Sequence, residues 1–257
     1  MTILGADIGN SHTVLGLIGD GVVEAEWRVS TDERRTADEW AVMLRGLVGD
    51  ALAGVDGIAV CATVPSVLRE WRDMLNRHFG DVTALVVEPG VRTGVPVLMD
   101  NPREVGSDRI LNALAAATDF GGPAIVVDFG GTATTFDVVS AQGQYVGGAI
   151  SPGIEISLAA LGRRGAQLRE VELMRPRNVI AKNTVEALQS GLVFGVASQV
   201  EGIVARMIAE LGVQTPEVRV IATGYLAGLV RDECTCFTDD APWLTLRGLE
   251  LVFARNT

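Results

Sequence analysis

The strongest constraint on the fold is a strand–turn–strand pattern that occurs twice. An apolar run from Thr2 ends at Asp7, and a polar turn then leads into a second apolar run and a third strand. The same order returns from Ala124, with Asp128 at the end of the strand. Hairpins of this kind are read from alternating apolar runs separated by Gly, Asn and Ser. Two of them at the heads of two similar halves indicate an internal duplication.

The two hairpins match without a gap. Asp7, Gly9 and Thr13 correspond to Asp128, Gly130 and Thr134. A carboxylate at a strand end, followed by a glycine turn, supplies an oxygen ligand for a cation and backbone N–H groups for a phosphate. The duplication therefore predicts a site for a phosphate compound and a cation.

Alternating helix and strand patterns follow each hairpin. A capping box at Thr36–Glu39 begins a helix through Val48, and a second at Asn183–Glu186 begins a long helix through Leu211. The other expected elements are strands at 57–62, 82–87 and 218–222 and helices at 65–79, from 107 and at 246–255. We expect an α/β protein with two similar domains, 1–121 and 122–257, whose mixed sheets are flanked by helices and enclose a ligand cleft between them.

Composition excludes several classes of protein. Apolar residues make up 48% of the chain and charged residues 21%, which is typical of a globular protein. The net charge of -11 argues against a nucleic-acid partner. The most apolar stretch, 191–213, contains three charged residues, so we expect no membrane span and a cytoplasmic location. Three cysteines are too few for a disulfide framework, and we interpret them as ordinary thiols.

Five stretches together resemble the motifs of a known family, the type III pantothenate kinases. They are 7–13, 100–109, 128–135, 147–153 and 182–186. The similarity runs from residue 3 to about 255 and implies the actin, Hsp70 and sugar-kinase superfamily, with two ribonuclease-H-like domains. It implies phosphorylation of pantothenate by ATP in the first step of coenzyme A synthesis, with Mg²⁺, a monovalent cation (K⁺ or NH₄⁺) and a homodimer.

The first motif suits ATP on physical grounds as well. Phosphoryl transfer depends on positioning and charge neutralisation, which backbone N–H groups, short polar side chains and a metal ion provide. The expected nucleotide contacts are Gly9, Asn10, Ser11, His12 and Thr13, and Asp7 would hold Mg²⁺ directly or through water. A plain polar hairpin turn, which prefers the same residues, remains the alternative.

The resemblance assigns the second motif to the nucleotide side. Asp128 would coordinate the monovalent cation, and Thr132 and Gly224 would contact the nucleotide. The alternative for Asp128 is a solvated carboxylate at a strand end.

The substrate side is expected at the start of the third predicted helix. By resemblance Asp108 is the general base that takes the proton of the substrate hydroxyl, and Arg109 grips pantothenate. A guanidinium suits a carboxylate because it donates two parallel hydrogen bonds. A helix N-cap with an acidic first turn is the alternative reading. Other expected substrate contacts are Met99, Gly106, Ser107 and Thr184, the last of them from the second subunit.

The sequence departs from the family pattern at four positions. Gly131 is an extra residue in the second motif, and Tyr225 stands where the family has the second glycine of a Thr-Gly-Gly turn near adenine. Met99 replaces a tyrosine seen in some members, and Ala181 replaces a common glycine. We expect the Tyr225 ring either to stack on adenine or, as we favour, to occupy its space.

Two other functions are compatible with these departures. One is a paralogous kinase that phosphorylates another small hydroxylated acid or a nucleoside with Asp108 as the base. The other is a ligand-binding regulator without transfer activity.

Overall fold

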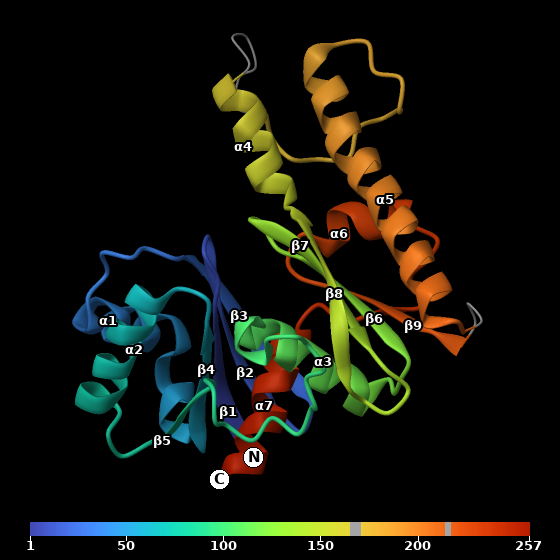
Figure 1. Ribbon diagram of the computed structural model, residues 1–257. Helices are drawn as coiled ribbons and strands as arrows, with labels where there is room; N and C mark the ends of the chain where they lie inside the picture. Colours follow the sequence, from blue (N-terminus) through green and yellow to red (C-terminus); the bar gives the residue numbers. More distant parts are fainter. Residues whose placement is uncertain (165–170, 214–216) are drawn as a thin grey trace. The chain divides into compact units, whose positions relative to one another are not determined.

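The computed structural model describes residues 1–164, 171–213 and 217–257. The chain forms two compact units (Figure 1). The first contains 1–115 together with 243–257, and the second contains 116–242. The division expected at 121 and 122 therefore differs most at the C-terminus, where the last helix belongs to the first unit because it packs against strands β1, β2 and β4 of that unit.

The first unit is built on a five-stranded mixed sheet in the order β3-β2-β1-β4-β5. Its strands are β1 (Thr2–Ile8), β2 (His12–Gly19), β3 (Val22–Ser30), β4 (Gly57–Ala62) and β5 (Thr83–Val86). Helices α1 (Ala37–Val48) and α2 (Pro65–His78) cover one face, and α7 (Leu244–Asn256) packs on β1, β2 and β4. The predicted capping box of Thr36 and Glu39 is present at the start of α1.

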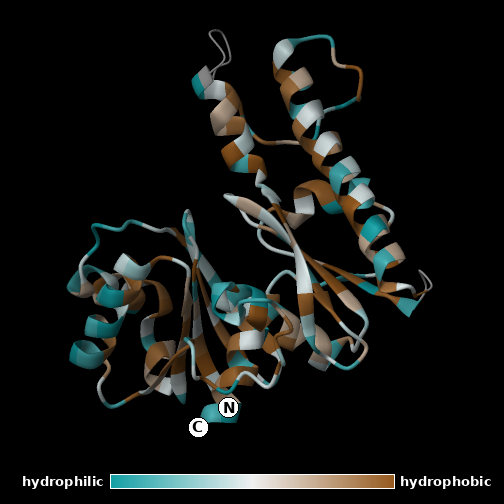
Figure 2. Cartoon of the chain, in the orientation of Figure 1, coloured by the Kyte–Doolittle hydropathy of each residue, from teal (hydrophilic) through white to brown (hydrophobic). Residues whose placement is uncertain are grey.

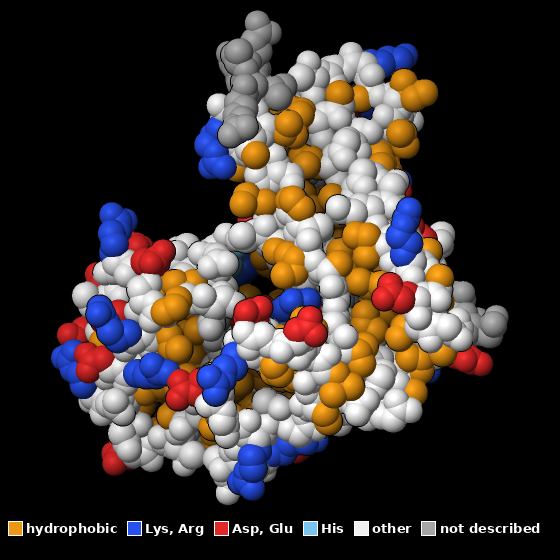
Figure 3. All heavy atoms as spheres, in the orientation of Figure 1, with side chains coloured by type: hydrophobic (Ala, Val, Ile, Leu, Met, Phe, Trp, Pro, Cys, Tyr) orange, Lys and Arg blue, Asp and Glu red, His pale blue; other side chains and the backbone are white. Residues whose placement is uncertain are grey.

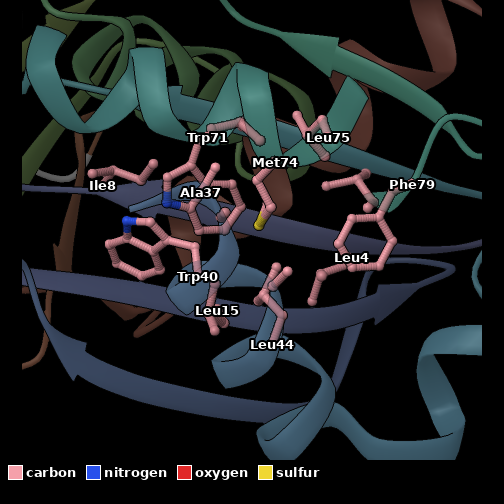
Figure 4. Close-up of a cluster of buried hydrophobic side chains, with 14 of the residues drawn as sticks. Leu4, Ile8, Leu15, Ala37, Trp40, Leu44, Trp71, Met74, Leu75 and Phe79 are labelled. Atoms are coloured by element: carbon pink, nitrogen blue, oxygen red, sulfur yellow. The ribbon is translucent and has the colours of Figure 1, made fainter. Parts of the chain in front are cut away.

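Apolar side chains between the sheet and α1 and α2 form the core of this unit. Trp40 of α1 and Trp71 of α2 are fully buried, with ring centroids 5.3 Å apart (Figure 4). Leu4, Ala6 and Ile8 of β1 point to this core, so the residues that alternate with them, Asp7 among them, lie on the opposite face.

The second unit repeats this plan. Its sheet has the order β10-β9-β6-β7-β8. The strands are β6 (Ala124–Phe129), β7 (Ala133–Val139), β8 (Tyr145–Pro152), β9 (Arg219–Thr223) and β10 (Asp239–Asp240). The helices are α4 (Ile154–Arg164), α5 (Thr184–Leu211) and the short α6 (Ala227–Val230). Helix α3 (Ser107–Asp119) begins in the first unit and ends in the second. Short 3-10 turns cover Gly49–Gly54, Pro102–Glu104 and Arg231–Glu233.

The duplication inferred from the two hairpins extends to the strand order. Each sheet places its first strand between the hairpin partner and a parallel strand, and Asp7 and Asp128 occupy equivalent positions. Asp7 pairs with Val14 and Cys61, and Asp128 pairs with Thr135 and Thr223. The predicted fold class, two similar domains with mixed sheets flanked by helices, is confirmed.

Helix α5 has the length and composition of a helix that could cross a membrane. However, it is the core helix of the second unit, because Leu192, Val200 and Val204 pack against the sheet. Figure 2 shows hydrophilic and hydrophobic residues interspersed along α5. At its start the Asn183 side chain accepts a hydrogen bond from the Glu186 N–H, whereas the Glu186 carboxylate binds Arg177 instead of closing the expected capping box.

Candidate active site

Asp7 lies at the carboxyl end of β1, beside β4. Its Oδ1 atom accepts a hydrogen bond from the Cys61 thiol, with a distance of 3.3 Å between Sγ and Oδ1. Cys61 is fully buried and is the residue of β4 that pairs with Asp7. Asp7 itself is only partly exposed.

The turn after Asp7 presents polar groups at the sheet edge. The Gly9 N–H donates to the His12 carbonyl at 3.0 Å, which closes the turn. Asn10 and Ser11 are exposed, whereas Thr13 is fully buried and its hydroxyl bonds that of Thr31 at 2.9 Å. The structure therefore leaves Asn10 and Ser11 accessible to a ligand and gives the Thr13 hydroxyl a structural partner.

Asp108 lies in the first turn of α3, as expected from the sequence. Its Oδ1 atom is buried and has no hydrogen-bond partner among the described residues. Burial raises the pKa of the Asp108 carboxyl, while backbone hydrogen bonds from Arg109 and Asp108 and the Arg109 charge act in the opposite direction. A carboxylate with an unsatisfied oxygen and a raised pKa is a suitable proton acceptor.

The absence of a side chain at Gly106 leaves room for the Asp108 carboxylate. A Cβ atom at position 106 would overlap Oδ1 of Asp108. The role expected for Gly106 was a substrate contact, and the structure adds a steric reason for glycine at this position.

Two carboxylates of the predicted site, Asp7 and Asp108, act on the Cys61 thiol. Burial raises the pKa of its thiol well above the ordinary value, and the charges of Asp7 and Asp108 raise it further. Both carboxylates therefore lie close enough to act on one thiol.

Asp128 occupies the equivalent position in the second unit. It lies at the carboxyl end of β6, beside β9, and the turn that follows β9 passes directly behind it. Gly224 in that turn has φ +91°, and a Cβ there would overlap Oδ1 of Asp128 and lie 2.8 Å from the Phe129 nitrogen. Glycine is required here both for the backbone angle and for the close approach.

Two of the four departures from the family pattern, Gly131 and Tyr225, lie next to one another. The Tyr225 hydroxyl donates to Oε2 of Glu155 at 2.7 Å, and a Cβ at position 131 would overlap both groups. The extra glycine is accommodated in the turn between β6 and β7, because Phe129 still pairs with Thr134 as Ile8 pairs with Thr13. The Gly131 carbonyl also accepts a hydrogen bond from the Ile156 N–H at 3.2 Å, which attaches the turn to α4.

The remaining predicted residues are spread over several segments. Ser107 and Arg109 lie with Asp108 in the first turn of α3, and Met99 lies in the segment that precedes the helix. Thr132 is partly exposed in the turn between β6 and β7. Thr184 is the exposed first residue of α5, in the second unit.

Mg²⁺ fits the residues of this site only with help from the nucleotide. No group of three or more His, Cys, Asp and Glu side chains in the described parts of the chain could hold a metal ion. Mg²⁺ commonly binds through one or two carboxylates together with substrate phosphates and water. Asp7, next to an exposed polar turn, meets that requirement.

Sequence reasoning missed two residues of the site, Cys61 and Glu155. Cys61 is 54 residues from Asp7, and Glu155 is 70 residues from Tyr225. The alignment of strand ends in a parallel pair could have indicated Cys61, since 57–62 was expected to be a strand. Glu155 carried no comparable signal, because the helix α4 that contains it was not predicted.

Comparison with known proteins agrees with this geometry. A family model described as type III pantothenate kinase matches residues 3–206. A type III pantothenate kinase of Nocardioides sp. is 78% identical over 256 residues, and both chains are covered completely. The chain belongs to the type III pantothenate kinase family. The Thermobifida fusca member is 61% identical over 99% of this chain and 100% of its own length.

Solved structures of much lower sequence identity have the same fold as this member of the pantothenate kinase family. The activator of the 2-hydroxyisocaproyl-CoA dehydratase from Clostridium difficile, with bound ADPNP, superposes with a TM-score of 0.57 at 14% identity. The alignment covers 100% of this chain and 96% of the activator. Component A of the (R)-2-hydroxyglutaryl-CoA dehydratase from Acidaminococcus fermentans gives 0.53 at 14% identity, with 98% and 95% covered. At these identities the likeness concerns the fold alone.

Proposed function

We propose that this chain transfers the γ-phosphoryl group of ATP to the primary hydroxyl of pantothenate, forming 4'-phosphopantothenate in the first step of coenzyme A synthesis. Membership of the type III pantothenate kinase family makes the chain a kinase and names the acceptor. The observation that carries the proposal is Asp108, whose buried Oδ1 lacks a hydrogen-bond partner among the described residues.

Asp108 acts as the general base. It accepts the hydroxyl proton as the hydroxyl oxygen bonds to the γ-phosphorus and the bond to ADP breaks. Because burial raises its pKa, the carboxylate has a stronger affinity for that proton than an exposed aspartate would have. Arg109, the next residue, holds the pantothenate carboxylate through its guanidinium group.

Asp7 and the turn after it hold the ATP phosphates. Asp7 would hold Mg²⁺ directly or through water, and Gly9, Asn10, Ser11 and His12, which follow β1, would contact the phosphates. Asp7 would hold Mg²⁺ where the ion would supply positive charge to neutralise the phosphates. Oxygen donors and a cation next to backbone N–H groups suit this role.

We assign the monovalent cation and further nucleotide contacts to residues of the second unit. Asp128 coordinates K⁺ or NH₄⁺, and Thr132 and Gly224 contact the nucleotide. Tight packing of Gly224 behind Asp128 supports this assignment, because it fixes the carboxylate beside the turn after β9.

The active form is a cytoplasmic homodimer in which Thr184 reaches the pantothenate site of the partner subunit. Exposed apolar side chains near Thr184 support an interface between copies. They are Met174, Val179, Ile180 and Val185, with exposures of 51%, 66%, 85% and 50%. Figure 3 shows hydrophobic side chains on the surface around α4 and α5.

The test is ATP turnover with pantothenate, Mg²⁺ and K⁺, with the product identified by mass. We expect pantothenate-dependent ADP release and formation of 4'-phosphopantothenate. Turnover only with a different hydroxylated acid or a nucleoside would identify a paralogue, and binding without turnover would identify a regulator. Either result would contradict the proposal.

The cation assignment has its own test. Replacing K⁺ by Na⁺ should lower the activity of the wild type, and Asp128→Ala should remove this difference because the site no longer discriminates between ions. Wild-type activity that is indifferent to the monovalent ion would contradict the role of Asp128.

A further inference from the structure

The buried thiol of Cys61 has no role in the mechanism described so far. It lies at the carboxyl end of β4, fully buried, and donates its hydrogen bond to Oδ1 of Asp7 at 3.3 Å. The parallel pairing of β1 and β4 sets Cys61 directly beside Asp7, so the contact is a consequence of the sheet register.

We propose that Cys61 is a positioning residue that fixes the Asp7 carboxylate in the orientation required for Mg²⁺. The inference rests on the proposed function, in which Asp7 holds the metal ion. A hydrogen bond to one carboxylate oxygen limits rotation of the group and so directs the lone pairs that remain for a ligand. Groups that orient metal ligands in this way are a general feature of metal sites.

A neutral donor suits this position better than a charged one. Lys or Arg beside Asp7 would form an ion pair and compete with a divalent cation for the carboxylate. The thiol is small enough for the interior of the sheet, donates a hydrogen bond and leaves the carboxylate charge in place.

The second unit has a similar residue beside its own strand-end carboxylate. Asp128 is the counterpart of Asp7, and the residue that pairs with it on the parallel strand β9 is Thr223, which is 1% exposed. Both strand-end carboxylates therefore have a small, buried, neutral residue with a hydrogen-bonding side chain as their parallel neighbour.

The experiment compares Cys61→Ala, Cys61→Ser and wild type, with Cys236→Ala as a matched loss of a thiol in the second unit. Mn²⁺ binding is titrated by electron paramagnetic resonance in the presence of a non-hydrolysable ATP analogue. The Mg²⁺ concentration for half-maximal activity and the KM for pantothenate are measured on the same proteins.

We expect Cys61→Ala to weaken Mn²⁺ binding by about tenfold, the lower end of the range for groups that orient metal ligands, because a thiol is a weak donor. Cys61→Ser, which keeps a donor, should stay within about threefold of wild type, and Cys236→Ala should match wild type. The KM for pantothenate should change little in all of them. A purely structural role would not produce rescue by serine in the metal titration.

Unchanged Mn²⁺ affinity in Cys61→Ala, or equal weakening in Cys61→Ser, would overturn the proposal. If Cys61→Ala fails to fold, Cys61→Val provides a variant of similar size without a donor, and the same comparison applies. Absence of pantothenate turnover in the wild type would instead contradict the proposed function, and the Mn²⁺ titration would still report on Cys61.

Discussion

The Asp108 carboxylate is in an environment that is unusual for a charged side chain. Asp108 combines a buried oxygen that lacks a hydrogen-bond partner in the described chain with backbone donors from the first turn of α3. Such an arrangement is unfavourable for a charged carboxylate unless a ligand completes it. At the scale of residues, the site therefore gives up stability for reactivity.

Asp108→Asn should separate activity from stability. We expect kcat to fall by about 10²- to 10⁴-fold because the base is lost. Burial raises the folded-state pKa of Asp108, so the carboxyl contributes most favourably to stability below its unfolded pKa, and this contribution is lost as pH rises through the folded pKa. The variant should therefore melt at a higher temperature than wild type at pH 7 to 8, with the difference shrinking towards pH 4.

The control for this prediction is Asp81→Asn, which changes an exposed aspartate of the same unit. Its kcat and thermal stability should remain close to those of wild type. Near wild-type turnover in Asp108→Asn would contradict the assignment of the base.

Gly106→Ala tests the position of the base without changing its chemistry. The new Cβ would overlap Oδ1 of Asp108, so the carboxylate must move. We expect kcat to fall by about tenfold or more, because small displacements of a catalytic group are costly, with a smaller change in the KM for ATP. Gly46→Ala, in an exposed part of α1 with open space around the Cβ, is the matched control and should stabilise the fold by up to about 1 kcal/mol. Equal kcat in both variants would show that a side chain at position 106 does not disturb the Asp108 carboxylate.

At the scale of elements, local patterns in the sequence predicted most of the structure. The two hairpins, the capped start of α1 and the length of α5 follow from runs of adjacent residues, and all agree with the structure. Helix α4 was not predicted. Its start, at Gly153 and Ile154, lacks the Ser/Thr/Asn and Glu pattern of a capping box from which the starts of α1 and α5 were predicted.

The sequence was sufficient to place Asp108 in the first turn of α3, because the residue and the turn are contiguous. Its role as the base stays a prediction. The Cys61 contact depends on parallel pairing of β1 with β4, and the Glu155 contact depends on α4 meeting the turn after β9. Contacts between distant segments are set by tertiary packing, which one sequence does not encode in its local pattern.

The contact of Gly131, Glu155 and Tyr225 predicts coupled effects on ATP use. Gly131→Ala alone should raise the KM for ATP, because its Cβ would overlap the Tyr225 hydroxyl and Glu155 and so displace the turn between β6 and β7. Tyr225→Phe removes the hydroxyl and its hydrogen bond to a carboxylate, a loss of about 1.5–3 kcal/mol in stability.

The double variant decides whether the residues act together. Gly131→Ala with Tyr225→Phe should restore part of the ATP affinity lost in Gly131→Ala, because one of the two overlapping groups is gone. Steady-state kinetics on both substrates and a double-mutant cycle measure this coupling. Additive effects on the KM for ATP would show that the two positions do not interact. An effect confined to the KM for pantothenate would show that they act on the pantothenate site and not on the nucleotide site.

At the scale of the whole molecule, one segment of the second unit exposes several large apolar side chains close together in the sequence. Residues 174–185 include Ile180, with 85% of its surface exposed, and Val179, with 66%. The segment is attached to α5, since the Ser190 hydroxyl donates to the Val179 carbonyl at 2.7 Å. Ordered apolar surface of this kind is typical of an interface between protein chains.

Ile180→Glu should therefore convert the expected homodimer into monomers. A charge buried in an apolar interface without a partner is strongly unfavourable, and the C₂ symmetry of a homodimer introduces it twice. Because Thr184 is expected to reach the pantothenate site of the partner subunit, the monomer should lose activity towards pantothenate by about tenfold or more while it remains folded. Solution scattering gives the oligomeric state, and kinetics at the same protein concentration give the activity. Val42→Glu, at an apolar position of α1 that is 70% exposed, is the matched control and should stay dimeric and active. A wild type that is monomeric and fully active would exclude both the interface and the contribution of Thr184 from a partner subunit.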